Sequence, residues 1–299
     1  LADISHPEAE RLAQEAAAYR TDIRQAAHRA MVEAPVVRLL DGTYIPRIPT
    51  RTGTRSREEG WFRQAAYGAL HLCESDVYDP TEEEMTWVLK DLEDNLFISR
   101  EWGRPVDLER YWFSHGGVTI QANLMDTAID YLRRGDVKAG LRSLFNNFGA
   151  STYTDVRCFT EHPVIELGHG IGPHYKVSDE SKALVWLRAF LLREVGETLH
   201  LAEGAPRAWF AAGQPAWGVQ RMASEFGPVT YRVQPAAGAL TVEVDAAWRH
   251  GPAELHIHLR APEGVTLHNV TVNGQPAAFA DGTVRITDPA DRITVRAEY

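Results

Sequence analysis

The hydrophobic period changes once along this chain of 299 residues, and that change limits the folds the chain can adopt. Up to about residue 195, apolar residues recur mainly at spacings of three and four, which is the period of an amphipathic helix. From about Glu197 onward they alternate with polar residues, which is the period of a half-buried strand. The sequence therefore predicts two regions, helical in residues 1–195 and antiparallel β in residues 196–299.

Six helices are expected in the first region, each marked by an apolar stripe and by capping or breaking residues. The link Arg133–Asp136 is short enough to join the fourth and fifth helices as an antiparallel pair. The sixth helix is apolar on nearly all sides, which predicts deep burial. Three glutamates, Glu82 to Glu84, crowd the first turn of the third helix. We interpret them as charges favoured by the helix dipole rather than as a metal site. The expected ranges are 7–31, 58–72, 81–97, 117–132, 137–149 and 179–193.

The second region contains short alternating runs about ten residues apart, separated by glycine, proline and asparagine, which is typical of an antiparallel β-sandwich. Asn273-Gly274 and Asp281-Gly282 are signals for tight hairpin turns between such strands. His256 and His258 fall on one face of a predicted strand. A His-x-His pair can bind a metal, but the sequence places no third ligand nearby. We therefore interpret both as polar residues on the solvated face of an edge or outer strand.

A segment with neither period lies between the last two helices, from Tyr153 to His174. Its 22 residues contain three glycines, two prolines, three histidines and three carboxylates. A loop of this length inside a compact chain is usually functional when it is not disordered. The segment is therefore predicted to be a functional loop, and Glu161 within it is the best candidate for a catalytic group.

The composition excludes several classes of partner. The formal net charge of −10 disfavours nucleic acid, which attracts basic surfaces. No apolar run approaches the roughly 20 residues of a membrane span.

Two cysteines, Cys73 and Cys158, are too few for a disulfide scaffold and are interpreted as buried small apolar groups. The chain begins at Leu1 rather than with methionine, so we expect a processed chain or a piece of a longer protein. An extracytoplasmic location, periplasmic or secreted, is slightly favoured.

Three short stretches carry a resemblance to one enzyme class. Residues 57–65, Arg-Glu-Glu-Gly-Trp-Phe-Arg-Gln-Ala, are similar to a segment that begins a helix and carries a catalytic acid. Tyr111–Val118 resembles a Trp-x-Gly-Gly loop that lines a sugar site, and Phe159–His162 resembles a loop that carries a general base. Residues 191–229 are similar to a hinge into a terminal β-sandwich. These motifs resemble those of the six-hairpin (α/α) toroid glycoside hydrolases, which include trehalase-like and oligosaccharide-glucosidase-like enzymes.

The resemblance implies a partial (α/α) toroid of helical hairpins followed by a C-terminal antiparallel β-sandwich. The expected helices are too few for a closed ring, so an upstream N-terminal portion or a partner chain is expected to complete it. The resemblance also implies Glu59 as general acid, with Glu58 as its rival, and Glu161 as general base. Further residues expected to contact the substrate are Trp61, Trp112, His115, Gly116, Gly117, Gln121, Tyr153, Arg157 and His162.

Glycoside hydrolysis suits such a pair of glutamates. One carboxylic acid protonates the leaving oxygen, and a second carboxylate acts on the opposite face of the sugar ring. An aromatic neighbour such as Trp61 favours the protonated form of Glu59. Glu161 lies in sequence near Arg157 and His162, and this polar setting favours the ionised form that a general base needs.

We therefore expect a glycoside hydrolase, or the C-terminal part of one, that cleaves an oligosaccharide or polysaccharide with inversion and without a cofactor or metal. Two alternatives stay open: a polysaccharide lyase on the same fold, and a non-catalytic carbohydrate-binding or assembly fragment. The predicted loops offer Arg157 and few other cations to neutralise a uronate, which favours hydrolysis over a lyase. His115, His162, His169 and His174 are interpreted as polar sugar contacts, because zinc ligands usually show tighter spacings.

Overall fold

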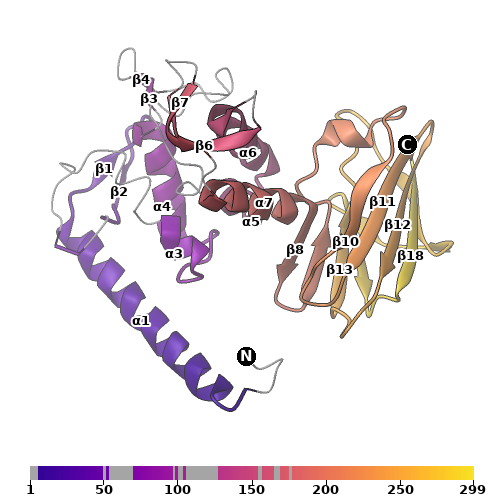
Figure 1. The fold of residues 1–299 in the computed structure, drawn as a ribbon, viewed down its shortest axis with the longest axis horizontal. Helices are drawn as coiled ribbons and strands as arrows, with labels where there is room; N and C mark the ends of the chain where they lie inside the picture. Colours follow the sequence, from indigo (N-terminus) through magenta and orange to yellow (C-terminus); the bar gives the residue numbers. More distant parts are fainter. Residues whose placement is uncertain are drawn as a thin grey trace. The chain divides into compact units, whose positions relative to one another are not determined.

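The computed structural model contains both helices and antiparallel sheets (Figure 1), and the sequence predicts both kinds of element. The chain forms two compact units, residues 1–183 (unit 1) and residues 184–299 (unit 2), whereas the sequence placed the division between residues 195 and 196. The helical toroid and the β-sandwich stay predictions. The structure describes residues 6–49, 52–53, 70–96, 98–99, 104–105, 127–153, 157–164, 169–174 and 177–299.

Unit 1 holds the helices. Two of them, α5 and α6, are joined by the short link at residues 134–136, as predicted, and the Asp136 side chain caps α6 by accepting a hydrogen bond from the Ala139 N–H at 3.3 Å. The predicted helices at 58–72 and 117–132 lie largely outside the described residues. The helices are α1 (Ala9–Glu33), α3 (Leu70–Glu74), α4 (Glu83–Asp91) with a π-helical turn at Leu92–Leu96, α5 (Thr127–Arg133), α6 (Val137–Ser151) and α7 (Val177–Leu191), which continues into unit 2.

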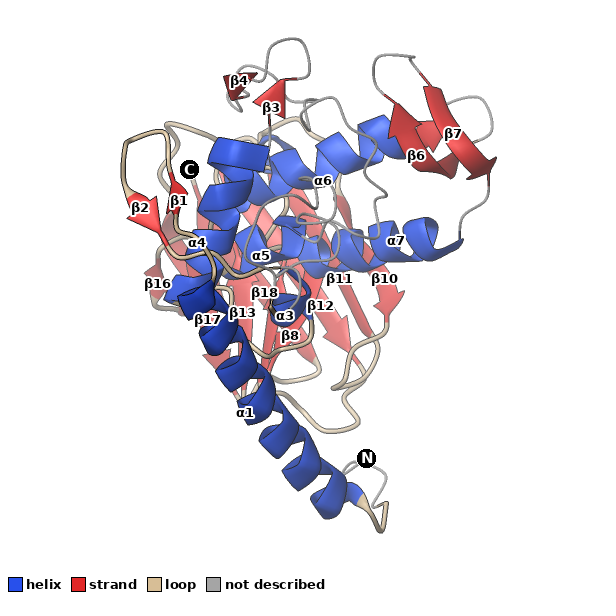
Figure 2. Ribbon diagram, turned by 90° about the vertical axis from the view of Figure 1, so that its left-hand side faces the viewer, coloured by secondary structure: helices blue, strands red, loops and turns tan. Residues whose placement is uncertain are grey.

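Helix α1 is attached to unit 1 by its C-terminal end. Ala27, Ala30 and Met31 are its buried residues, and the N-terminal part of the helix runs away from the other elements of unit 1 (Figure 2). The Arg24 guanidinium pairs with the Glu82 carboxylate at 2.5 Å and lies over the Tyr78 ring, 4.1 Å from its centroid. The first glutamate of the predicted acidic run therefore binds a neighbouring helix through its side chain.

A carboxylate on α3 links this helix to α7 within unit 1. Glu74 pairs with the ammonium of Lys182, and its Oε2 lies 3.0 Å from Nδ1 of His71. The hydrogen bond with His71 is the largest cause that lowers the pKa of Glu74 to about 2, the contacts with Lys182 act in the same direction, and burial opposes them. The folded state therefore holds this carboxylate in its ionised form.

We expect Glu74 to contribute stability that is lost in acid. Its pKa falls from 4.5 to about 2 on folding, so the contribution is present above pH 4.5 and disappears as the pH falls towards 2. Glu74→Gln should lower the free energy of unfolding at neutral pH by less than about 1 kcal/mol, because the pair is partly exposed. It should also flatten the acid dependence of that free energy, measured by urea unfolding at a series of pH values. Glu83→Gln on the exposed side of α4 is the control, and the same acid slope in both variants would contradict the assignment.

Two neighbouring features differ from their predictions. The segment from Tyr153 to His174 is not a long loop, because β5 (Thr152–Tyr153), β6 (Cys158–Val164) and β7 (His169–His174) form a three-stranded antiparallel sheet. Helix α7 is not buried all round: Trp186 and Phe190 are buried, but Leu184 is 67% exposed. The described part of unit 1 also contains two short strand pairs, β1 (Val37–Arg38) with β2 (Tyr44–Ile45) and β3 (Ile98–Ser99) with β4 (Arg104–Pro105).

Unit 2 consists mainly of a six-stranded and a five-stranded sheet. The orders are β10-β11-β12-β18-β14-β15 and β16-β17-β13-β9-β8, and every neighbouring pair is antiparallel except β13 and β9, which run parallel. The strands are β8 (Leu192–Val195), β9 (Thr198–Leu201), β10 (Trp217–Met222), β11 (Val229–Ala236), β12 (Ala239–Ala246), β13 (Glu254–His258), β14 (His268–Val272), β15 (Gln275–Pro276), β16 (Phe279–Ala280), β17 (Thr283–Thr287) and β18 (Arg292–Glu298).

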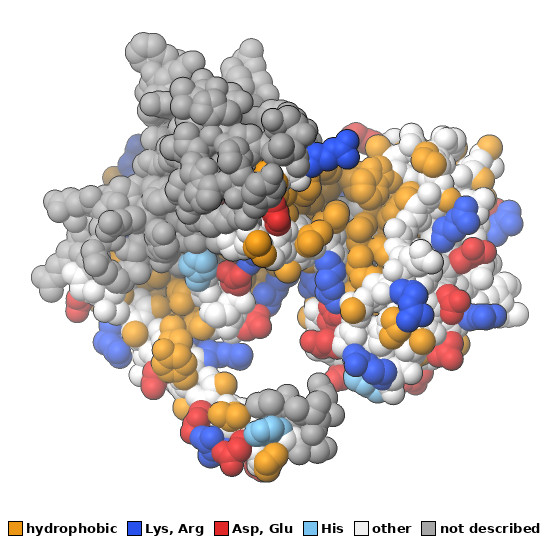
Figure 3. Space-filling view, in the orientation of Figure 1, with side chains coloured by type: hydrophobic (Ala, Val, Ile, Leu, Met, Phe, Trp, Pro, Cys, Tyr) orange, Lys and Arg blue, Asp and Glu red, His pale blue; other side chains and the backbone are white. Residues whose placement is uncertain are grey.

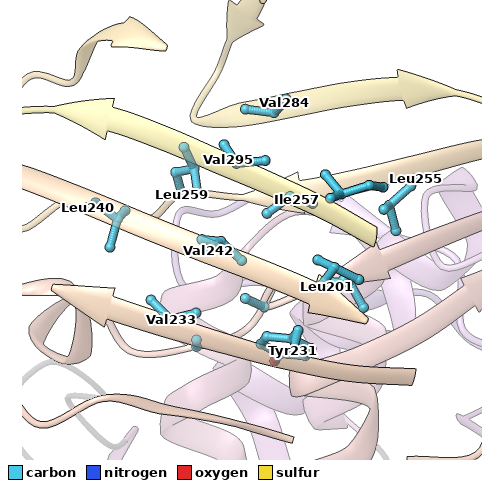
Figure 4. Packing of buried hydrophobic residues seen from close by; sticks show 14 of the residues in the cluster. Leu201, Tyr231, Val233, Leu240, Val242, Leu255, Ile257, Leu259, Val284 and Val295 are labelled. Carbon is cyan, nitrogen blue, oxygen red and sulfur yellow. The ribbon is translucent and has the colours of Figure 1, made fainter. Parts of the chain in front are cut away.

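The predicted alternation explains the core of unit 2. Alternate residues of the long strands are buried, and side chains from both sheets belong to one apolar cluster (Figure 4). Val233 and Val242 come from the six-stranded sheet, and Ile257 and Leu201 from the five-stranded sheet. Outside this core, charged side chains of both signs are interspersed on the face of unit 2 seen in Figure 3. Period-two patterning therefore sorts apolar residues inward and charged residues outward.

The hairpin turns and the cysteines agree with their predictions. Asn273 and Gly274 have φ of +50° and +79°, and the neighbouring strands β14 and β15 pair across them, as a type I′ turn requires. Both cysteines are buried and free. Among the described residues, no helix combines the length and the apolar character needed to cross a bilayer.

Candidate functional site

Four of the predicted site residues lie on one small sheet. Tyr153 ends β5, Arg157 is in the turn that follows, and Glu161 and His162 are consecutive residues of β6. The sequence places these residues within ten positions of one another, and the strand pairing draws them into a single structural element. The other predicted site residues, Glu59 and its rival Glu58 with Trp61, Trp112, His115, Gly116, Gly117 and Gln121, lie outside the described residues.

The register of this sheet changes at Glu161. His162 pairs with Ile171, whereas Thr160 pairs with His174. One residue of β6, Glu161, therefore lies opposite two residues of β7, Gly172 and Pro173, and this arrangement is a β-bulge. Proline has no N–H for a strand ladder and is tolerated at a bulge. Bulges are common beside active sites because they re-aim a strand locally.

Two helices hold the start of β6. The Phe159 ring contacts the Phe148 ring of α6 edge to face, with centroids 5.1 Å apart. The Phe159 N–H donates a hydrogen bond to Oε1 of Glu180 on α7 at 3.5 Å. Phe159 and Cys158 are both buried. The backbone two residues before Glu161 is therefore fixed by packing on α6 and by a hydrogen bond to α7.

The loop prediction for residues 153–174 was wrong because the glycines and prolines of this segment interrupt the strand period, although strands form there. Those residues are concentrated in β7, which is an edge strand of the sheet and carries the bulge. Edge positions and bulges are the two places where a strand tolerates proline and glycine. The turn at Arg157 also fits a hairpin, since its φ of +55° reverses the chain between β5 and β6.

A second group of polar side chains lies in unit 2, on the face of the five-stranded sheet opposite its core. His200 of β9 and His258 of β13 come from adjacent parallel strands, and Nδ1 of His200 lies 3.1 Å from Nε2 of His258. Oε1 of Glu203 lies 3.9 Å from Nδ1 of His200. One nitrogen from each histidine and one Glu203 oxygen all lie within 4.8 Å of one another.

Each member of this group has a further partner. Oγ1 of Thr283 lies 3.2 Å from Nδ1 of His258, so the two ring nitrogens of this histidine have different neighbours. The guanidinium of Arg193 donates to both oxygens of Glu203 at 2.6–2.8 Å. The His256 ring contacts the His200 ring, with centroids 4.8 Å apart. The group is therefore a connected polar network rather than a set of separate surface residues.

His200 and His258 stay neutral near pH 7. Burial is the largest cause that lowers the pKa of His200 to about 3, followed by the positive charge of Arg193. Burial also lowers the pKa of His258 to about 3, followed by its proximity to His200. A neutral imidazole keeps a lone pair on one nitrogen, which is the form that binds a metal ion.

His258 also lines a pocket of about 280 Å³ with two arginines in its wall. Arg207 donates to the Ala261 carbonyl at 2.7 Å, and Arg260 donates to the Ala205 carbonyl at 2.8 Å. Burial is the largest cause that lowers the pKa of Arg260 to about 10, and the charge of Arg207 adds to it. Asp281 also lines this pocket, so its wall carries charges of both signs.

The sequence interpretation of His256 and His258 needs correction. Strand β13 is the third of five strands, so it is not an edge strand, and His200 and Glu203 supply the nearby polar partners that are not apparent from the sequence around β13. The reason is topological, because β9 and β13 pair in parallel although His200 and His258 are 58 residues apart. The local signal was a second short motif, His200-x-x-Glu203, directly after another strand of alternating pattern.

Comparison of the chain with protein-family models and with curated proteins found no match.

Proposed function

We propose that this chain is a carbohydrate-active enzyme, a glycoside hydrolase or the C-terminal part of one, which cleaves a glycosidic bond of an oligosaccharide or polysaccharide. One observation supports the proposal most directly. Tyr153, Arg157, Glu161 and His162 come together on a single bulged sheet, with the bulge at the proposed catalytic base. A carboxylate, a phenol, a guanidinium and an imidazole are groups suited to binding sugar hydroxyls.

The proposal extends to the fold. In it, unit 1 belongs to an (α/α) toroid and unit 2 is a terminal β-sandwich. The α5–α6 pair with its short link supports a helical hairpin in unit 1. Two sheets that share one apolar core support a sandwich in unit 2.

The proposed chemistry is inverting hydrolysis. Glu161 acts as general base and removes a proton from the attacking water, while Glu59 acts as general acid and protonates the leaving oxygen. Water attacks the anomeric carbon, the glycosidic bond breaks, and the proton from Glu59 goes to the departing sugar. Inversion requires space for the water, with the two carboxyl groups about 6.5–9.5 Å apart. Trp61 and Trp112 are the proposed stacking surfaces for sugar rings.

A panel of neutral and acidic oligosaccharides and polysaccharides tests the proposal. We expect at least one substrate to yield new reducing ends, and proton NMR of the first product formed should show the inverted anomer. Ultraviolet absorbance from an unsaturated uronate would identify a lyase instead and would contradict hydrolysis. Neither turnover nor saturable binding across the panel, the latter measured by calorimetry, would contradict a carbohydrate function altogether.

A further inference from the structure

We propose that His200, Glu203 and His258 form a binding site for one divalent transition-metal ion, and that zinc is the ion this donor set fits best. All three residues belong to unit 2, and none takes part in the proposed hydrolysis. Two imidazole nitrogens and one carboxylate oxygen are a recognised ligand set for zinc, with the fourth position left for water or another small ligand. Oxygen-preferring ions such as Mg²⁺ and Ca²⁺ are disfavoured by two imidazoles.

The distances between the donor atoms match shared coordination. A tetrahedral zinc ion about 2.0–2.1 Å from each imidazole nitrogen places those nitrogens about 3.3 Å apart. Nδ1 of His200 and Nε2 of His258 are 3.1 Å apart, so these two nitrogens already lie at nearly this separation. The Glu203 oxygen lies 3.9 Å from Nδ1 of His200, and the three donor atoms lie within 4.8 Å of one another, so this oxygen needs to move inward by roughly 1 Å for the same geometry.

The surrounding groups support the ligands. Oγ1 of Thr283 lies 3.2 Å from Nδ1 of His258, and in the tautomer whose Nδ1–H donates to this oxygen the lone pair of His258 is on Nε2, towards His200. Such a partner on the other ring nitrogen is the usual support of a zinc-bound histidine. Arg193 holds the Glu203 carboxylate in place, with a side chain that is only 13% exposed. Its positive charge opposes a cation, so removal of this charge should tighten metal binding.

The position of the site suggests what the ion does. It would connect Glu203 and the end of β9 with the end of β13, across the parallel strand pair of the five-stranded sheet. An ion bound to these residues in the folded chain and not in the unfolded chain stabilises the fold. Bound zinc should therefore raise the thermal midpoint of unit 2.

Metal content measured on the full chain tests this site. The chain is loaded with Zn²⁺, dialysed against metal-free buffer and analysed by mass spectrometry for zinc, and binding is measured separately by calorimetry. We expect a single retained zinc ion and a higher midpoint of thermal unfolding. His200→Gln and His258→Gln should each weaken zinc binding by more than about 100-fold, because even supporting residues typically cost 10- to 100-fold. Arg193→Met should bind zinc more tightly than the parent chain.

His256→Gln is the matched control, because His256 lies on the same face of β13 as His258 and its Nε2 pairs with Glu254 at 2.6 Å. This variant should keep the zinc ion. Full zinc retention in the His200→Gln/His258→Gln double variant would overturn the proposal, and so would equal loss in His256→Gln. X-ray absorption at the zinc edge of the unmodified chain covers the case in which a variant fails to fold. Two imidazole ligands and at least one oxygen are expected there, and a spectrum with oxygen ligands alone would overturn the site.

Discussion

Replacement of Glu161 with glutamine is expected to lower kcat for hydrolysis by about 100- to 10,000-fold, which is the usual contribution of a general base. Glutamine keeps the size of the side chain but cannot remove a proton from water. Because β6 is anchored two residues earlier by Phe159, the substitution should leave the sheet in place. The dissociation constant for an oligosaccharide should therefore change little. Initial rates of reducing-end formation and calorimetric binding separate these two effects.

The control for Glu161→Gln is Glu83→Gln, the same chemical change on an exposed helix position of unit 1. Its kcat should equal that of the parent chain. Undiminished kcat in Glu161→Gln would remove this residue from the mechanism. A parallel loss of sugar binding and of circular dichroism would instead indicate a structural role, and that result would equally contradict the assignment.

Replacement of Phe210 with alanine is expected to lower the free energy of unfolding of unit 2 by about 3–5 kcal/mol. Phe210 is fully buried, and its ring contacts the Trp217 ring edge to face at 5.2 Å between centroids. It belongs to the core that the two sheets share, so the lost ring leaves a cavity among β-strands that cannot easily collapse. Urea unfolding followed by far-ultraviolet circular dichroism measures the change.

Trp209 offers the matched control for Phe210. It precedes Phe210 in the same 3₁₀ turn and contacts the same Trp217 ring at 5.3 Å, but it is 36% exposed. Trp209→Ala should therefore cost well under half as much as Phe210→Ala, since part of its surface remains in water when the chain is folded. Equal losses in the two variants would show that the contact with Trp217, and not burial in the core, carries the effect.

The sequence was most informative about unit 2, where the governing signals are local. Alternation over β11 and β12 follows from neighbouring residues, and the turn at Asn273-Gly274 follows from the positive φ that both positions tolerate. A strand needs only a few residues to show its period. The helical period is also a local signal, and helices α1, α4, α6 and α7 accordingly lie close to their predicted positions.

Both polar sites depended on information that the sequence does not display locally. The β6–β7 hairpin was missed because the residues that break alternation, Gly172 and Pro173, are at a bulge on an edge strand. The His200–Glu203–His258 group was missed because it requires the parallel pairing of two strands that are distant along the chain. The burial of α7 was overestimated because composition gives the number of apolar residues and not the number of faces that have a packing partner.

The place of β18 within its sheet has a consequence for how unit 2 is made. This strand, residues 292–298, lies between β12 and β14. During synthesis β12 emerges from the ribosome with one edge unpaired, and it stays so until about fifty further residues have followed, since translation is slower than hairpin closure. An exposed edge is a template for pairing with other chains. Unit 2 should therefore fold late and slowly compared with a meander of successive hairpins, and nascent chains interrupted before residue 292 should be prone to aggregation.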